Sequence, residues 1–513
     1  MSDALDRGIT VTEMAPMDQP IDVLPETTAA FVGRALRGPV NQPVLIQSLG
    51  EFRRRFGETW SRSSLGPAAQ LFFEHGGRNL YIVRVANHAR GAMICLPASG
   101  SALVLRAVEP GSTERIRAAV DYDGIDANDD DLFNLTLQRI EPATGLVADQ
   151  EMFQGVSCRQ DSESFIGNVL TTSSLAQIEA PFPTHRPEAT SGTDRQYSQA
   201  YIEHAQGGSD GHELSDYDLI GSRRDETGLF ALQQVEHFDL LYLPPPGKGR
   251  DIGPASLLAA DRYCRERNAM LITDPASDWV TPAKAVEGMR RLGIGSPNVI
   301  GYFPRMYSRK SEESPPRAVG GALAGLLCKQ DRDRGPWNVL DLKGLEFQRD
   351  LVAAYEIDDA DESALSRQGF NVIARGTAGR AVVRGCVTMG RGCEEHRLFA
   401  ALPVRRLYLH IVNAIDKGTR WSVFEKGDEQ LAARLNSQVT AYLAAMADMG
   451  ALETDEFTVD CDAGLCKRSD ALGHGVTILV RLQPCGCSKP LSFTLHQTIA
   501  GCRVTSTAFA PVI

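Results

Sequence analysis

The sequence predicts a mixed α/β protein in which a largely parallel sheet lies between two layers of helices, an α/β/α core. Short apolar strands alternate with amphipathic helices over residues 28–89, and the same alternation resumes at residue 226. Residues 90–225 show instead the short alternating runs and turn clusters of antiparallel sheet. We therefore expect a core that is interrupted by an antiparallel β insertion domain and followed by a C-terminal α+β domain, with extended arms at both termini.

Composition places the chain among ordinary folded proteins. Of its 513 residues, 43% are apolar and 23% charged, which excludes the disordered, collagen-like and coiled-coil classes. The net charge of −12 argues against nucleic-acid binding, and no stretch approaches the roughly 20 apolar residues of a membrane span. The first residues lack a basic segment followed by an apolar run, so we expect no secretion signal.

Residues 1–27 are expected to form an extended N-terminal arm. Ile9 and Val11 lie in a short strand pattern, and three prolines then keep the chain extended and remove amide donors. Few of these residues could build a core of their own.

Residues 28–89 hold the first part of the predicted core, and residues 226–345 hold the second. The first part contains predicted strands at 29–33, 44–46 and 80–85 and helices at 48–56 and 67–75. The second contains three β-α units, with strands at 238–243, 269–273 and 298–303 and helices at 254–267, 282–292 and 316–329.

Residues 90–225 between them are predicted to be a peripheral β-rich insertion. Six aspartates fall between Asp121 and Asp131, but Gly124 comes too early for a calcium-binding loop. A solvated loop is therefore favoured over a calcium site. Residues 181–225 are rich in Pro, Gly and Ser and are expected to be a long surface connection.

Residues 346–513 are predicted to form the C-terminal α+β domain. Its first helix begins at Pro403 and ends at Gly418, and its second runs from an N-cap at Asp428 to Gly450. Strands are expected at 457–460, 476–482, 491–495 and 503–508, followed by an apolar end.

The sequence offers only weak evidence for a catalytic site. Asp274 follows a predicted strand, which is where an α/β enzyme places a catalytic group, but no nucleophile elbow or phosphate-binding loop accompanies it. The glycines of 247–253 do not match a dinucleotide loop. An α/β hydrolase or nucleotide-binding enzyme that uses the Asp274 strand end stays open as an alternative of a different class.

The cysteines near the C-terminus raise the question of a metal site. Cys461, Cys466, Cys485 and Cys487 could close a zinc site, but neither pair has the usual C-x2-C spacing. Thiols on adjacent strands are the favoured interpretation, and we expect no metal and no cofactor.

Several segments, taken together and in order, resemble the contractile tail sheath family of myophages, tailocins and related injection systems. They are Thr28–Ala35 with Gly38–Asn41, Phe52–Gly57, Phe72–Gly77 with Tyr81–Val85, Asp331–Trp337, Gln368–Ile373, Arg405–Leu407, and Trp421–Glu425 with Asp428.

The resemblance implies a structural subunit and no enzymatic activity. Such a subunit polymerises as stacked hexameric rings around an inner tail tube, between baseplate and terminator proteins, and contracts to drive the tube through a cell envelope during genome ejection. It would be assembled in the host cytoplasm and located in the virion tail, with no direct contact with nucleic acid and no membrane insertion. A sheath from a genome-free injection device or tailocin is an alternative that the sequence leaves open.

The resemblance also assigns roles to the two ends of the chain. In the family, terminal arms add strands to sheets of neighbouring subunits. Ile9 and Val11 at one end, and Val504, Phe509 and Val512 at the other, suit such donation.

A basic stretch at 399–426 suggests a contact with the inner tube. It has a net charge of +3 on an acidic chain, and in the family the C-terminal region grips the tube. Its basic residues, which we expect on an exposed face, are Arg405, Arg406, Lys417, Arg420 and Lys426. Solvation of these side chains, or pairing within the subunit, is the alternative.

Overall fold

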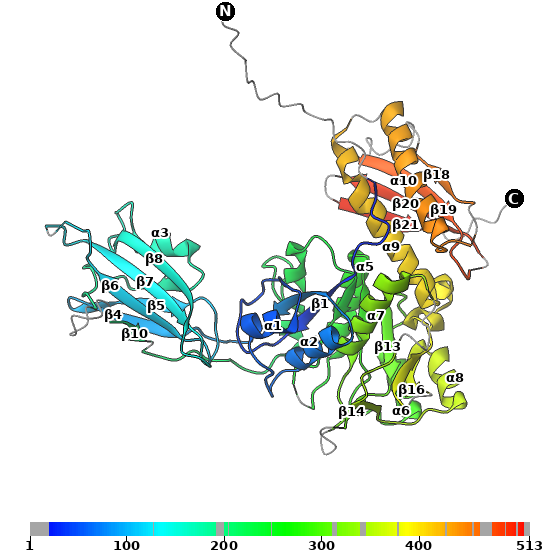
Figure 1. The fold of residues 1–513 in the computed structure, drawn as a ribbon, viewed down its shortest axis with the longest axis horizontal. Coiled ribbons are helices and arrows are strands. Elements are labelled where there is room, and N and C mark those ends of the chain that lie inside the picture. Colours follow the sequence, from blue (N-terminus) through cyan, green and yellow to red (C-terminus); the bar gives the residue numbers. More distant parts are fainter. Residues whose placement is uncertain are drawn as a thin grey trace, which may run out of the picture.

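The computed structural model describes residues 20–506 apart from 127, 191–199, 204, 248, 310–314, 339–344, 377–378, 426–427, 454–455, 462–474, 488 and 499–500. Figure 1 shows an α/β core in the middle, a β-rich insertion at one end and a mixed α+β part at the other. The predicted fold class is confirmed.

The core is built on one eight-stranded sheet in the order β17-β16-β13-β12-β11-β1-β3-β2. Strands β16 to β3 in this order are parallel, and β17 and β2 close the two edges in antiparallel pairs. The parallel strands are buried on both faces, which is why they read as unbroken apolar runs. The bounds are β1 (Thr28–Gly33), β2 (Val44–Ile46), β3 (Asn79–Arg84), β11 (Leu240–Tyr242), β12 (Met270–Thr273), β13 (Val299–Phe303), β16 (Phe370–Arg375) and β17 (Ala381–Arg384).

Helices cover both faces of this sheet, as predicted. One face carries α2 (Leu65–Glu74) and α7 (Gly320–Arg334), and the other carries α5 (Pro254–Glu266), α6 (Pro282–Leu292) and α8 (Asp359–Arg367). Smaller elements complete the core: α1 (Leu49–Phe56), α4 (Asp216–Ile220), η2 (Gly228–Gln234), η3 (Met389–Gly392), η4 (Glu394–Phe399) and the ribbon of β14 (Met306–Ser308) and β15 (Leu351–Ala353).

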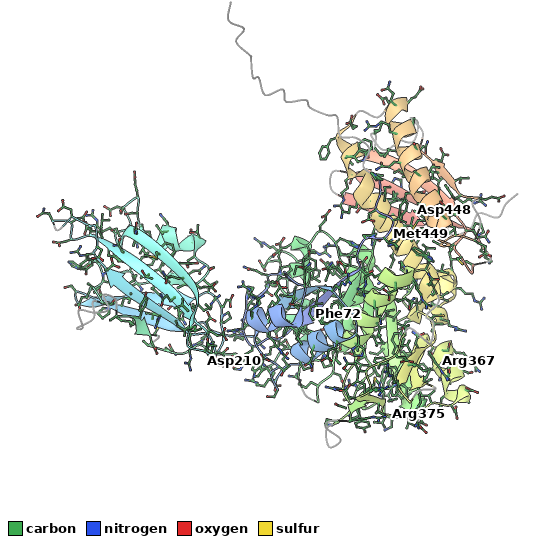
Figure 2. The ribbon with its side chains drawn as sticks, viewed as in Figure 1. Phe72, Asp210, Arg367, Arg375, Asp448 and Met449 are labelled. Atoms are coloured by element: carbon green, nitrogen blue, oxygen red, sulfur yellow. The ribbon has the colours of Figure 1, made fainter. Side chains whose placement is uncertain are left out.

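Glycines of α7 let it approach α2 closely. A Cβ at Gly321 would lie 2.3 Å from the Ala68 carbonyl oxygen, and one at Gly325 would lie 2.3 Å from that of Phe72. Phe72, labelled in Figure 2, is fully buried there. Any larger residue at these two positions of α7 would push the helices apart.

The insertion consists of two antiparallel sheets with their own apolar core. One contains β6 (Ile116–Asp121), β7 (Leu132–Ile140), β8 (Val147–Ser157) and β10 (Ile202–Glu203), and the other contains β4 (Met93–Ala98), β5 (Ser101–Ala107) and β9 (Ala176–Glu179). Helices α3 (Ile166–Val169) and η1 (Leu170–Thr172) pack at one end.

The C-terminal part places α9 (Leu402–Thr419) and α10 (Glu429–Asp448) on a four-stranded antiparallel sheet. The strands follow in chain order: β18 (Thr458–Asp460), β19 (Gly475–Leu482), β20 (Leu491–Thr498) and β21 (Gly501–Ser506). The short helix η5 (Arg420–Phe424) follows directly on α9. As predicted, Asp428 caps α10, where its carboxylate accepts the Leu431 amide at 2.9 Å.

Three predicted boundaries are corrected by the contacts. The core continues past residue 345, because β16 pairs with β13 and β17 pairs with β16. The insertion ends near His212, which bridges to Asn87, since α4 already packs on α5 of the core.

The third correction concerns the N-terminal arm, whose predicted limit was residue 27. Residues 20–27, here called the strap, are attached to the body of the protein. Ile21 is 7% exposed and packs against Gly418 of α9, and the carbonyl of Val23 accepts a hydrogen bond from His410 at 2.8 Å. The first 19 residues, including Ile9 and Val11, lie outside the described residues.

Candidate assembly sites

The basic stretch 399–426 does not form the exposed face that the sequence suggested. Arg406 is 6% exposed and forms an ion pair with Asp331 of α7. Arg405 donates to the Asn298 side chain at 2.6 Å, and its guanidinium lies over the Phe399 and Tyr408 rings, 4.6 and 4.9 Å from the two centroids. Burial lowers the pKa of Arg405 to about 10. The prediction of surface exposure is therefore wrong for Arg406, and Arg405 is engaged within the subunit.

The physical reason lies in the position of α9. Most of this helix is buried, because it packs on α/β core residues as well as on β20. The predicted apolar stripe of Leu407 and Ile411 is correct, but the neighbouring arginines also point into protein, where Asp331 and Asn298 receive them. The sequence pattern of α9 alone does not show that a residue on another helix will bind one of its arginines.

The remaining basic residues lie at the end of α9. Lys417 and Arg420 are both exposed, and Arg420 forms ion pairs of 2.8 Å with both Glu236 and Asp416. Lys426 lies outside the described residues. Phe424, in η5 beside them, is 82% exposed, a feature that the sequence analysis did not single out. This corner between α9 and α10 is the part of the basic stretch that could meet another protein.

A second candidate surface is the edge of the C-terminal sheet. Strand β21 is at the edge of the described sheet and pairs with β20 alone. Val504 belongs to β21 and packs partly buried against the apolar core, so it is part of the subunit's own sheet and not of a departing arm. Phe509 and Val512 lie outside the described residues. An unpaired strand edge is a template for strand addition.

Asp274, the residue of the enzymatic alternative, has a structural role. Its Oδ1 accepts the Val319 and Gly320 amides at 3.0 Å each, at the start of α7, and its Oδ2 accepts from the Tyr242 hydroxyl. Burial raises the pKa of this carboxyl. The group is thus committed to capping a helix.

The cleft beside Asp274 has a volume of about 350 Å³ at the carboxyl ends of β11 and β12. Its polar residues are used within the fold, since Asp251 pairs with Arg305 and also accepts from Ser277 at 2.7 Å. We find no nucleophile paired with a base among the described residues that line this cleft.

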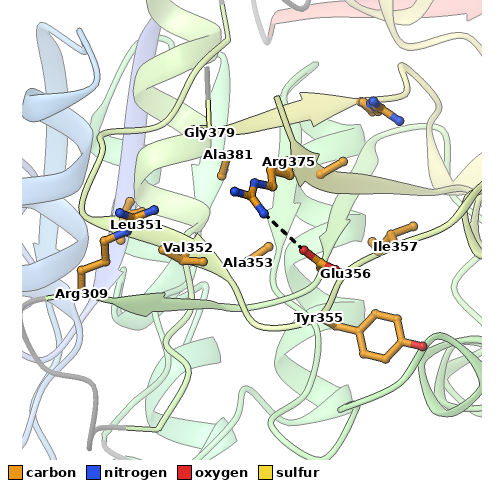
Figure 3. Close-up of a pocket in the computed structure, with 12 residues that line it drawn as sticks. Arg309, Leu351, Val352, Ala353, Tyr355, Glu356, Ile357, Arg375, Gly379 and Ala381 are labelled. Atoms are coloured by element: carbon orange, nitrogen blue, oxygen red, sulfur yellow. Dashed lines mark ion pairs between the residues drawn. The ribbon is translucent and has the colours of Figure 1, made fainter. Parts of the chain in front are cut away.

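Another cleft, of about 330 Å³, lies beside β15 and the ends of β16 and β17 (Figure 3). Arg309, Arg375 and Arg384 are among its lining residues. Arg375 faces Glu356 at 3.7 Å, but both side chains are largely exposed, so this ion pair contributes little to the free energy of folding.

The cysteines do not assemble into a metal site in the described part of the chain. Cys461 is buried, Cys485 exposed and Cys487 half-buried, while Cys466 lies outside the described residues. No group of three His, Cys, Asp or Glu side chains suited to a metal ion occurs among the residues that were placed. Nor does the placed chain contain a helix long and apolar enough to cross a bilayer.

Comparison with known proteins gives one curated relative by sequence. No family model matches the chain. Over 170 residues it is 26% identical to the tail sheath protein of Vibrio phage KVP40, a match that covers 32% of this chain and 24% of that protein. The matched segment thus spans about a quarter of the length of this relative.

Solved structures match nearly the whole chain. The sheath tail protein Lin1278 from Listeria innocua has a TM-score of 0.61 at 13% identity, covering 92% of this chain and 95% of that one. The helical sheath of the anti-feeding prophage in the contracted state has a TM-score of 0.56 at 14% identity, covering 95% and 98%. The sheath complex of the extracellular contractile injection system PVC, also contracted, has a TM-score of 0.54 at 11% identity. The chain therefore has the fold of the contractile tail sheath proteins, and the proteins that it resembles are structural sheath subunits, not enzymes.

Proposed function

We propose that this chain is the subunit of a contractile tail sheath. Copies of it polymerise as stacked hexameric rings around an inner tail tube, between a baseplate and a terminator protein. The sheath then passes from a stretched to a compact packing and drives the tube through a cell envelope during genome ejection. The work comes from the difference in free energy between two packings of the same folded subunit.

The observation that carries the proposal is the extent of the structural match. Core, insertion and C-terminal part together align with sheath subunits over 92–95% of the chain, so the likeness is not limited to one common α/β layer. The named relative comes from a phage, which favours a virion tail and assembly in the host cytoplasm. Matches to PVC and the anti-feeding prophage favour the second candidate, a sheath of a genome-free injection system.

Subunits would be linked by strand addition at the edge of the C-terminal sheet. The outer edge of β21 offers backbone donors and acceptors, and a strand pattern at Ile9 and Val11 could supply a donor from a neighbour. The C-terminal arm, with Phe509 and Val512, would play the reciprocal part from beyond residue 506.

The inner tube would contact the corner at the end of α9. Lys417 and Arg420, with Lys426 close in sequence, supply positive charge beside the exposed ring of Phe424. Contacts of exposed charges are individually weak, which suits a sheath that has to release the tube and slide.

The test is electron microscopy of the protein expressed alone. We expect long striated tubes from the full chain and folded but unpolymerised particles from a chain without residues 1–19. The deletion has to stop before residue 20, because the strap is packed on α9. Uniform small particles from the full chain, at high concentration and low salt, would contradict the sheath function.

The tube contact is tested separately with Lys417→Glu. We expect reduced co-assembly with the tube protein and unchanged polymerisation of the sheath alone. Lys284→Glu is the matched control, because Lys284 is an exposed lysine on α6 of the core. Equal co-assembly of both variants at low salt would remove Lys417 from the contact.

A further inference from the structure

The cleft beside β15, here called the β15 cleft, carries an excess of positive charge (Figure 3). Arg309, Arg375 and Arg384 line it with one acidic residue, Glu356, so its lining has a net charge of +2. Arg375 pairs with Glu356 at 3.7 Å and Arg384 with Glu362 at 3.6 Å. All four side chains in these two pairs are partly or largely exposed, so the pairs are weak. The arginines therefore remain available to an anionic partner.

Apolar side chains line the same cleft. Val352 and Ala353 of β15, with Tyr355 and Ile357 after it, are only partly buried there. The volume of about 330 Å³ is at the lower end of the range for sites that take a drug-sized ligand, and one aromatic side chain is smaller than such a ligand. The β15 cleft thus suits an aromatic ring that is accompanied by negative charge.

The chain itself presents such a group on α4. Tyr217 is 87% exposed, more than any other large apolar side chain in the described part of the chain. It lies between two carboxylates: Asp216 accepts from the Ser256 hydroxyl at 2.9 Å, and Asp218 accepts from the Ser215 hydroxyl at 2.6 Å. Both donors are neutral, so these contacts leave a charge of −2 beside the ring. Residues 216–218 are here called the knob.

The knob and the β15 cleft lie toward opposite ends of the central sheet. Strands β16 and β17, which border the cleft, stand at one end of the strand order. Helix α4 packs on α5 and η2, and η2 contacts β3 near the other end. The core holds the two apart, so a knob can enter only the cleft of another copy. Such a contact joins two different surfaces head to tail and can repeat along an assembly.

We propose that the β15 cleft is an interface between copies of this chain and receives Tyr217 of a neighbouring copy. The ring packs on the apolar side chains of β15, and the arginines of the cleft meet the ring face and the carboxylates of Asp216 and Asp218. Tyrosine and arginine are the residue types that, with tryptophan, most often dominate the energy of an interface. That this contact recurs within a sheath rests on the proposed function, whereas the contact itself does not.

Photocrosslinking of the full chain tests the contact directly. Benzoylphenylalanine in place of Tyr217 keeps an aromatic side chain on the knob and reacts with what it touches. An equal mixture of isotope-labelled and unlabelled chains, irradiated at high concentration and low salt, separates crosslinks between copies from crosslinks within one. We expect mass spectrometry to find position 217 joined to residues 351–357 of another copy. The same probe at Phe424, which is also aromatic and exposed, should leave 351–357 unmodified.

Charge reversal in the cleft tests the electrostatic part. Arg375→Glu should lower the yield of this crosslink at least about ten-fold, because like charges then face each other. Arg375→Gln should have a smaller effect, and raised salt should lower the yield for the unmodified cleft. Arg290→Glu is the matched control, since Arg290 is an exposed arginine of α6 away from the cleft. Equal yields from Arg375→Glu and Arg290→Glu would overturn the proposed match of charges.

The remaining outcomes separate this interface from other occupants and from the proposed function. A chain that gives no crosslink from position 217 to 351–357, yet binds inorganic phosphate in the cleft, would have a small-anion site there, and the interface would be overturned. Tubes that form without the crosslink would likewise count against the interface alone. Crosslinked copies in a protein that forms no tubes would support the interface and contradict only the sheath function.

Discussion

The C-terminal part and the insertion differ in whether their apolar residues pack together with those of the α/β core. Side chains of α9, α10, β19 and β20 belong to one continuous apolar cluster with α2, α7 and one face of the central sheet. The insertion has a separate apolar cluster of its own. The C-terminal part therefore shares its core with the α/β sheet, whereas the insertion buries its apolar residues in a cluster of its own.

The junction of the insertion is polar and buried. Arg84, at the end of β3, is 2% exposed and donates to the carbonyls of Ala35 and Gly38 in the core and to that of Pro110 in the insertion, the last at 2.7 Å. Burial lowers the pKa of this guanidinium to about 10. One side chain thus connects three backbone segments that meet where the insertion begins.

Further charges surround this arginine. Glu109 accepts the Gly38 amide at 3.1 Å, and Arg139 pairs with Glu114 at 2.7 Å. Asp210, labelled at the base of the insertion in Figure 2, accepts from Arg34 through its carbonyl at 2.7 Å and from Ser112 through its side chain at 2.8 Å. Buried ion pairs often add little net stability compared with apolar packing, so we expect this junction to act mainly by fixing the orientation of the insertion.

The largest effect is expected when the parts are separated. A fragment of residues 86–212 should fold alone with a cooperative thermal transition, because its apolar cluster is complete. A fragment of residues 402–513 should not, since much of the buried surface of α9 faces the core. Circular dichroism of the two fragments decides the matter, and a folded, monomeric C-terminal fragment would refute the shared core.

A matched pair of cavity substitutions tests the same difference in the intact chain. Ile411→Ala and Leu135→Ala each remove a fully or almost fully buried aliphatic side chain, at about 2–5 kcal/mol apiece. The Ile411 variant should weaken the core and the C-terminal part together, and the Leu135 variant only the insertion. Hydrogen exchange resolved by peptide reports where protection is lost. Loss confined to α9 and the C-terminal sheet in Ile411→Ala would argue for two independent cores.

The sequence predicted those features that depend on local pattern. The predicted helix 282–292 coincides with α6, where Thr281 accepts the Lys284 amide as N-cap and Gly293 is left-handed. The helix predicted at 316–329 begins instead at Gly320, because Asp274, far away in the chain, caps it there. Local signals located the elements, and contacts between distant segments set their limits.

The same distinction explains the errors at the candidate sites. The predicted C-terminal domain began at residue 346 and so took in the segment that forms β16 and β17, because the pairing of β16 with β13 and of β17 with β16 has no local signature. Arg406 was predicted to be a surface charge because its partner, Asp331, lies 75 residues away in the sequence. At the end of α9, by contrast, Lys417 is exposed to solvent, as the sequence suggested.

A smaller effect is expected from the junction arginine. Arg84→Met leaves several carbonyls without a donor, and we expect a loss of about 1–3 kcal/mol. The insertion should stay folded but take up a wider range of orientations, visible by small-angle scattering. Arg159→Met is the control within the insertion, because Arg159 is exposed and pairs with two surface aspartates, Asp131 and Asp161. An unchanged scattering profile for Arg84→Met would show that other contacts fix the orientation.

The smallest effect concerns mild acid, to which the core and the insertion should respond differently. His75 of the core is buried, its Nδ1–H donates to the Leu71 carbonyl at 2.7 Å, and its Nε2 accepts the Gln348 amide at 3.2 Å. Burial lowers the pKa of His75, and burial likewise lowers the pKa of His410 beside the strap. In the unfolded chain both histidines take up protons near pH 6.5, so the unfolded state binds more protons than the folded state below that pH.

The stability of the core is therefore complete above about pH 6.5 and falls as the pH drops, by at most about 1.4 kcal/mol per pH unit for each histidine. His237, whose pKa is raised within its pair with Asp239, acts in the opposite sense, since its contribution is present below pH 6.5 and is lost at higher pH. In the insertion, burial raises the pKa of Glu114, so acidification favours the folded state of the insertion and does not weaken it.

Urea unfolding at pH 7.5 and pH 5.5, followed by peptide-resolved exchange, should thus show a less stable core beside an insertion of unchanged or slightly greater stability. His75→Gln, which keeps one donor and one acceptor but cannot titrate, should remove part of the loss. Equal acid sensitivity of His75→Gln and the unmodified chain would exclude His75 as its source.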